Sequence, residues 1–227
     1  SHTMKKSIFI LFLFFYFPIF SQAPISKSLG EFSKLKVYDL INVELIQSSE
    51  NRIEISGENA KSVSIIQKNT TLKIRMVVSK YFKGEDTFVK LFYTKVNTID
   101  VNEGAKVISE TPIQQYEVEL KAQEGGEITI PVNTKVLTIK SVTGGKIQVY
   151  GTSKSQNIDI NTGGVYRGEK LQAQISKIRI KAGGNAEVRS SDLIDIKIFA
   201  GGLLTVFGQT TNIKNNNIFG GKIIYKD

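Results

Sequence analysis

The chain has 227 residues, a formal net charge of +9 and no cysteine. Without cysteine it has no disulfide, no thiolate metal site and no cysteine nucleophile, so its folded state must depend on core burial and backbone pairing. Lysine and arginine are scattered singly along alternating segments, which favours a solvated sheet face or attraction to acidic polymers over nucleic-acid binding.

The N-terminal residues predict a secretory leader. Ser1–Thr3 resemble an expression scar or upstream translation, and residues 4–21 hold two lysines followed by an apolar run from Ile8 to Phe20. This run is shorter than the roughly 20 residues of a membrane span, and small or polar residues follow it as a cleavage site. We therefore predict a signal peptide over 4–21, with an uncleaved anchor as the alternative. After cleavage no integral membrane span remains, and the protein is expected in the periplasm, at the outer membrane or outside the cell.

Residues 22–98 are predicted to form a β-rich N-terminal part without glycine punctuation. Apolar-x-apolar units recur every 17 to 19 residues, beginning at Leu35, Ile53, Leu72 and Val89. These units predict either further solenoid rungs or, with a hairpin turn at residues 69–71, an antiparallel cap that shields the first rung. The polar stretch 79–86 is predicted to form a long loop.

Residues 99–227 carry the strongest signal of the chain, a repeat of glycine pairs. The pairs recur at steps of 19, 19, 20, 18 and 19 residues, and alternating apolar and polar residues run up to each pair and usually away from it. Alternation with a period of two is typical of β-strands. The predicted structural glycines are Gly125, Gly126, Gly144, Gly145, Gly163, Gly164, Gly183, Gly184, Gly201, Gly202, Gly220 and Gly221.

Two folds can be built from such a repeat. In an antiparallel meander the two strands of one repeat pair with each other, whereas in a parallel β-solenoid each strand stacks on the equivalent strand of the next rung. Apolar pairs such as Leu137/Ile139 and Ile158/Ile160 stay in step between repeats, as stacking of like on like requires. We therefore predict an all-β, parallel β-helix or solenoid, with the meander as the alternative. Its glycines mark corners where a positive φ or a close approach of rungs disfavours a Cβ atom.

The polar residue between two paired apolar positions points outward and forms a column along the rungs. The predicted column runs through Glu119, Thr138, Asp159, Arg179, Lys197 and Lys214. Its basic end, at Arg179, Lys197 and Lys214, is the predicted contact for an anionic polysaccharide or another component of an envelope or host surface. The sequence leaves the formation of a homo-oligomer open.

Groups for catalysis are scarce. The only histidine, His2, lies in the leader, so triads that need histidine and zinc sites built from histidine or cysteine are excluded. Acids such as Glu117/Glu119 and Glu124/Glu127 alternate on predicted strands, where a solvated face is the simpler interpretation. Strands follow the glycine pairs, which lack the spacing of nucleotide-binding loops. We predict no catalytic residue, metal ligand or cofactor; a polysaccharide lyase or glycosidase is the alternative, and a passive periplasmic structural protein a further one.

These motifs together resemble the putative auto-transporter adhesin, head GIN domain family of secreted bacterial proteins. The likeness covers about Phe32 to Tyr225, with an opening K-V-x-x-x-I-x-V-x-L-x-Q pattern followed by strand-Gly-Gly-strand units. The opening pattern is met by Lys36, Val37, Ile41, Val43, Leu45 and Gln47. The sequence departs from the family at Leu40, where glycine is common, and in having TGG or AGG corners in place of Ser-Gly-Ala-Gly turns. The resemblance implies a right-handed β-helix-like fold at the envelope or outside the cell, and a role in adhesion.

Overall fold

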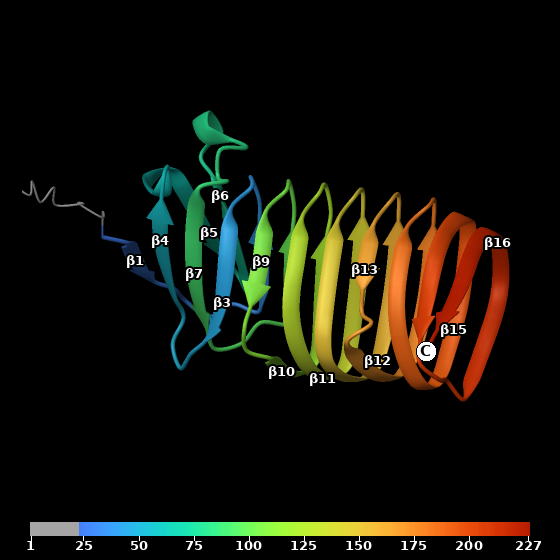
Figure 1. The fold of residues 1–227 in the computed structure, drawn as a ribbon. Coiled ribbons are helices and arrows are strands. Elements are labelled where there is room, and N and C mark those ends of the chain that lie inside the picture. Colours follow the sequence, from blue (N-terminus) through green and yellow to red (C-terminus); the bar gives the residue numbers. More distant parts are fainter. Residues whose placement is uncertain (1–22) are drawn as a thin grey trace, which may run out of the picture.

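A computed structural model describes residues 23–227, so the predicted leader lies outside the described residues. The chain winds into a parallel β-solenoid of about 7 turns with a repeat of about 19 residues (Figure 1). All strand pairs among β10 to β16 are parallel, which rules out the antiparallel meander. The predicted fold class is confirmed.

The first seven strands form the N-terminal part of the solenoid. They are β1 (Ile25–Ser28), β2 (Lys34–Val37), β3 (Asn42–Gln47), β4 (Arg52–Gly57), β5 (Val63–Lys68), β6 (Thr71–Met76) and β7 (Thr87–Tyr93), with two 3-10 helices, η1 (Ala60–Ser62) and η2 (Val78–Lys80). The later strands are β8 (Thr98–Val101), β9 (Lys106–Ser109), β10 (Ile113–Ala122), β11 (Glu127–Val142), β12 (Lys146–Asn161), β13 (Val165–Arg167), β14 (Leu171–Lys181), β15 (Asn185–Phe207) and β16 (Asn212–Lys226). The longest strands bend around a corner and so contribute to both faces of the solenoid.

Two sheet faces enclose the core. Face A follows each glycine corner and comprises β3, β7, β9 and residues 127–132, 146–151, 165–167, 185–190, 202–207 and 221–226. Face B precedes each glycine corner and comprises β2, β6, β8 and residues 117–122, 136–142, 155–161, 175–181, 193–199 and 212–219.

Apolar side chains stack like on like between the two faces. On face B one inward column is made of Ile139, Ile158, Ile178 and Ile196, each at most 3% exposed. Full burial of such a side chain contributes about 1.5–3 kcal/mol relative to leaving it in water. Because neighbouring rungs lie about 4.8 Å apart, β-branched residues of equal size fill each layer of the core without gaps.

The two glycines of a corner have different roles, as Gly144 and Gly145 show. Thr143 and Gly144 both adopt left-handed backbone conformations, with φ of 49° and 72°, which makes the corner a tight turn of the type that favours glycine at its second position. Gly145 needs no unusual φ. A Cβ atom there would lie 2.2 Å from the carbonyl oxygen of Ala122 on the preceding rung, so the close approach of the rungs requires glycine.

Leu40 departs from this corner pattern. It takes the left-handed position with φ of 64°, where the corners from Gly104 onward use glycine. Its side chain lies over the neighbouring corner at Gly104, where an added Cβ atom would come within 2.5 Å of Leu40 Cδ2. The absence of a side chain at one corner therefore makes room for the leucine at the next.

The N-terminal end is closed by antiparallel strands, as predicted for a cap. β1 pairs antiparallel with β4, β4 with β7, and β5 with β6 across the hairpin turn at Asn69 and Thr70. The N-terminal apolar units are rungs in part: those at Leu35, Leu72 and Val89 lie in parallel rungs, out of chain order, whereas the one at Ile53 lies in the antiparallel cap. Leu35 of β2 stacks directly on Leu72 of β6, and β2 and β3 lie between the β6/β7 rung and the β8/β9 rung. β1 therefore lies at the outer edge of the cap, β2 and β3 form a rung further in, and the chain returns outward through β4 to β7 before it winds forward from β8.

The different roles of the corner glycines lead to a paired prediction. Gly144→Ala should lower the free energy of unfolding by about 1 kcal/mol, because only the left-handed backbone is strained. Gly145→Ala should cost about 3 kcal/mol, because its methyl group would meet backbone that cannot move aside. Urea unfolding followed by circular dichroism measures both losses. Equal losses at the two positions would contradict this division of roles.

Candidate functional site on face B

The parallel register arranges the outward side chains of face B in two neighbouring columns. Column 1 contains Thr71, Lys34, Thr98, Glu119, Thr138, Asn157, Lys177, Asp195 and Lys214. Column 2 contains Lys73, Lys36, Asp100, Lys121, Lys140, Asp159, Arg179, Lys197 and Asn216. Six cations and only two carboxylates make column 2 strongly basic.

The single outward column predicted from the sequence is wrong in its register. Column 1 holds Glu119, Thr138 and Lys214, whereas column 2 holds Asp159, Arg179 and Lys197. Arg179 and Lys197 are therefore direct neighbours, but Lys214 faces Asp195 in the other column. The predicted basic end is thus spread over both columns.

A buried polar residue explains the error. Gln156 occupies the inward position opposite Leu137, where the pattern leads one to expect an apolar residue. Its amide donates to Ser176 Oγ at 2.8 Å, and its oxygen accepts from the Tyr166 hydroxyl at 2.7 Å. Because these hydrogen bonds satisfy the amide, glutamine is tolerated in the core. The sequence pattern aligns Leu137 with Ile158, whereas in the structure Leu137 pairs with Gln156, so the predicted register is shifted by two residues.

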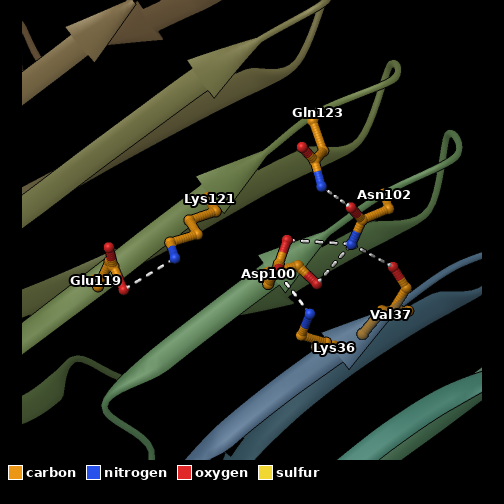
Figure 2. Close-up of polar contacts among 7 residues, drawn as sticks. All are labelled: Lys36, Val37, Asp100, Asn102, Glu119, Lys121 and Gln123. Carbon is orange, nitrogen blue, oxygen red and sulfur yellow. Dashed lines mark hydrogen bonds and ion pairs between the residues drawn. The ribbon is translucent and has the colours of Figure 1, made fainter.

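Asp100 lies at the centre of a polar network in the N-terminal half of face B (Figure 2). Lys36 Nζ lies 3.4 Å from Asp100 Oδ2, and Asn102 Nδ2 donates to Asp100 Oδ1 at 3.1 Å. Gln123 Nε2 donates in turn to Asn102 Oδ1. The carboxylate of Asp100 is 8% exposed, so its charge is used within the protein and is poorly available to a ligand.

Glu119 forms a second group of ion pairs on the neighbouring rungs. Its carboxylate lies 2.9 Å from Lys140 Nζ and 3.3 Å from Lys121 Nζ. Burial alone would raise the pKa of Glu119, but the two ammonium groups outweigh it and hold that pKa below its ordinary value. Glu119 therefore stays ionised and neutralises part of the basic face.

The C-terminal half of face B contains a groove of about 270 Å³ between the two columns. Its charged lining consists of Lys140, Lys177, Arg179, Lys197, Asp159 and Asp195. Arg179 Nη1 lies 3.5 Å from Asp159 Oδ2, but both side chains are about half exposed, so solvent screens this pair. Within residues 23–227 no carboxylate lies within 4.0 Å of the amino group of Lys177 or Lys197. These lysines give the groove an unneutralised positive charge.

Of the four acids considered for catalysis, Glu119 and Glu127 are engaged in ion pairs on the sheet faces. Glu127 lies 3.0 Å from Lys146 and 3.7 Å from Lys106, and Glu119 is held as described above. In the described part of the chain no group of three or more histidine or acidic side chains is placed to hold a metal ion. The face therefore offers repeated positive charge and hydrogen-bond donors.

The fold brings together one carboxyl pair that the sequence pattern does not reveal. Asp39 and Glu103 occupy equivalent positions of neighbouring corners, where Leu40 N donates to Glu103 O at 3.1 Å. Burial, followed by hydrogen bonding to Asp39, raises the pKa of Glu103. Asp39 is fully buried and accepts from Met76 N at 3.0 Å. Because the carboxylate of Asp39 is buried and bonded to backbone amides, we assign this pair a structural role at the corner.

The described residues contain no helix that is long and apolar enough to cross a membrane. The sequence model of a family described as "Putative auto-transporter adhesin, head GIN domain" matches residues 31–210. No curated protein matches the chain.

Solved structures from Bacteroides and Parabacteroides have the same fold. A putative adhesin from Bacteroides fragilis superposes with a TM-score of 0.78 at 17% identity, covering 89% of this chain and 94% of that one. A putative adhesin from Parabacteroides merdae gives 0.67 at 17% identity, covering 90% and 95%. A protein named as a putative lipid binding protein from Parabacteroides distasonis gives 0.66 at 16% identity, covering 90% and 97%. At these identities the likeness shows the fold alone.

The low pKa of Glu119 predicts how its contribution to stability depends on pH. Because that pKa is lower in the folded chain than in the unfolded one, the carboxylate stabilises the fold above its unfolded value of 4.5, and the contribution is lost as the pH falls through the folded pKa. Glu119→Gln should therefore cost about 0.5 kcal/mol near neutral pH and nothing at about pH 2. Urea unfolding at several pH values measures this difference, with the exposed Glu117→Gln as control. A cost that grows toward acid pH would contradict the assignment.

Proposed function

The chain belongs to the putative auto-transporter adhesin, head GIN domain family, and from this membership and the charge of face B we propose that it is an exported, non-enzymatic adhesin that binds an anionic polymer. The polymer would be an acidic polysaccharide of a cell envelope or of a host surface. The observation that carries the proposal is the groove on face B, where Lys177 and Lys197 have no carboxylate within 4.0 Å among residues 23–227.

The spacing of the cations suits a linear ligand. Lys177 and Arg179 lie on one rung and Lys197 on the next, and Lys140 lies two rungs before them, so a chain lying along the solenoid axis meets positive charge repeatedly. Each exposed contact contributes at most about 1 kcal/mol, and salt weakens it. Attachment would then depend on the number of rungs that the ligand spans, as in other multivalent binding.

Export is supported by the predicted leader and by membership of an adhesin family. A polysaccharide lyase or glycosidase finds less support, because Glu119 and Glu127 are held by lysines on solvated faces. A passive structural role leaves the uncompensated charge of the groove without a use. An enzyme would release new sugar ends into solution, whereas a passive structural protein would leave the polysaccharide both unbound and unchanged.

A charge-reversal pair tests the proposal. The mature chain, residues 22–227, should be retained on acidic but not on neutral polysaccharides, and retention should fall when salt rises from about 50 mM to about 500 mM. Arg179→Glu combined with Lys197→Glu should reduce retention about tenfold, because two adjacent attractions become repulsions. Lys61→Glu combined with Lys95→Glu makes the same change in net charge at exposed positions outside the groove and serves as control.

Two results would decide against the binding function of face B. One is equal retention of the groove variant and the control. The other is the appearance of new sugar ends in the supernatant, which would establish the enzymatic alternative in place of adhesion.

A further inference from the structure

The loop between β6 and β7, residues 77–86, projects beyond the line of corners near the N-terminal end (Figure 1). It is called the 77–86 loop below. Thirteen large apolar side chains are exposed among the described residues. Four of them belong to this loop, within the six consecutive residues 77–82. They are Val77 (39% exposed), Val78 (75%), Tyr81 (37%) and Phe82 (58%). Exposed apolar side chains concentrated in this way mark an interaction site more often than scattered ones do.

The base of the loop is held firmly, so the exposure of its tip does not come from fraying. The buried Asp39 accepts hydrogen bonds at its carboxylate from Met76 N at 3.0 Å and from Phe82 N at 3.4 Å. Its carbonyl oxygen accepts from Gly84 N at 3.1 Å, and Asn42 Nδ2 donates to the carbonyl oxygen of Glu85 at 2.8 Å. These hydrogen bonds attach the base of the loop to the solenoid corner at Asp39 and Asn42.

The tip keeps its apolar groups outward. The guanidinium of Arg75 lies 4.4 Å from the centre of the Tyr81 ring and fixes this side chain at the foot of the loop. Phe82 adopts a left-handed backbone with φ of 57°, an uncommon conformation for a bulky residue. Val78 and Phe82 remain the most exposed apolar groups of the loop.

Lys80 and Lys83 flank these apolar groups at the tip, whereas the two acids of the loop, Glu85 and Asp86, follow Gly84 at its base, where Asn42 Nδ2 donates to the carbonyl oxygen of Glu85. Apolar and aromatic tips flanked by lysines are typical of segments that enter the interface of a lipid bilayer, where the rings reach the acyl boundary and the ammonium groups reach anionic headgroups. We propose that the 77–86 loop docks on a phospholipid surface that contains anionic headgroups. Val78 and Phe82 enter the interface, and Lys80 and Lys83 bind headgroup phosphates.

The size and shape of the tip favour a bilayer over a protein partner. A stable protein interface buries about 800 Å² on each side and needs a complementary surface. A few convex side chains on one loop are too small for that, but a bilayer needs no matching shape. The groove on face B begins at Thr138, far along the chain, so loop docking and polymer binding can be altered separately.

Vesicle binding tests the proposal. The mature chain should sediment with vesicles of phosphatidylethanolamine and phosphatidylglycerol, and weakly with phosphatidylcholine alone. Val78→Ser combined with Phe82→Ser should lower the partition coefficient at least about tenfold, because two apolar groups no longer leave water. Phe199→Ser combined with Phe219→Ser is the matched control: these rings are 62% and 68% exposed, stack at 5.9 Å near the C-terminal end, and should not affect vesicle binding.

A tryptophan reporter identifies the segment that inserts. The chain has no tryptophan, so Phe82→Trp provides a single fluorophore at the tip. Its emission should shift to the blue with anionic vesicles and be quenched by brominated lipids, whereas Phe219→Trp should show neither effect.

Three outcomes would overturn the proposal. The first is equal sedimentation of the loop variant and the unchanged chain. The second is loss of vesicle binding only in the Arg179→Glu and Lys197→Glu variant, which would assign headgroup binding to face B. The third is self-association in centrifugation that the loop variant abolishes without any vesicle binding, which would assign the loop to a second copy of the chain.

Discussion

Parallel stacking of each rung on the next, about 4.8 Å away, is the constraint on which the rest of the structure depends. At the corners this approach leaves no room for a Cβ atom where Gly145 meets the carbonyl oxygen of Ala122. On the faces the same approach forces equivalent residues into columns, so that core isoleucines stack on isoleucines. Corners, core and surface charge are therefore consequences of one register.

The register also decides where charge accumulates. Two like charges on adjacent rungs repel by about 1 kcal/mol even in water, so a column of lysines needs carboxylates between them. Asp100 separates Lys36 from Lys121, and Asp159 separates Lys140 from Arg179. The alternation is incomplete, because Lys73 and Lys36, Lys121 and Lys140, and Arg179 and Lys197 are direct neighbours. Glu119 of column 1 forms ion pairs with both Lys121 and Lys140, whereas no carboxylate lies within 4.0 Å of the Lys197 amino group among residues 23–227. The groove on face B lies where the interleaving is incomplete, which leaves positive charge that an external polyanion can neutralise.

The sequence was sufficient for the architecture because the glycine pairs report directly on the corners of the repeat. It was insufficient for the register, since the hydrogen-bonded Gln156 stands at a core position and conceals the alignment of two rungs. The order of the N-terminal rungs could not be predicted from the sequence either. β2 lies between β6 and β8, and β3 lies between β7 and β9, so neither strand pairs with a strand that is close in the sequence. The sequence pattern correctly predicted that Arg179 and Lys197 are neighbours. It did not predict that Lys177 and Lys140 line the same groove, because their positions depend on the register seen in the structure.

The central claim is that a linear acidic ligand binds along the cations of the groove on face B. The most direct test is calorimetric titration of the mature chain with linear acidic oligosaccharides of increasing length. We expect the affinity to rise with each added unit until the ligand spans the groove and then to level off, and to fall as salt is added. An affinity independent of both ligand length and salt would contradict binding along the columns of face B.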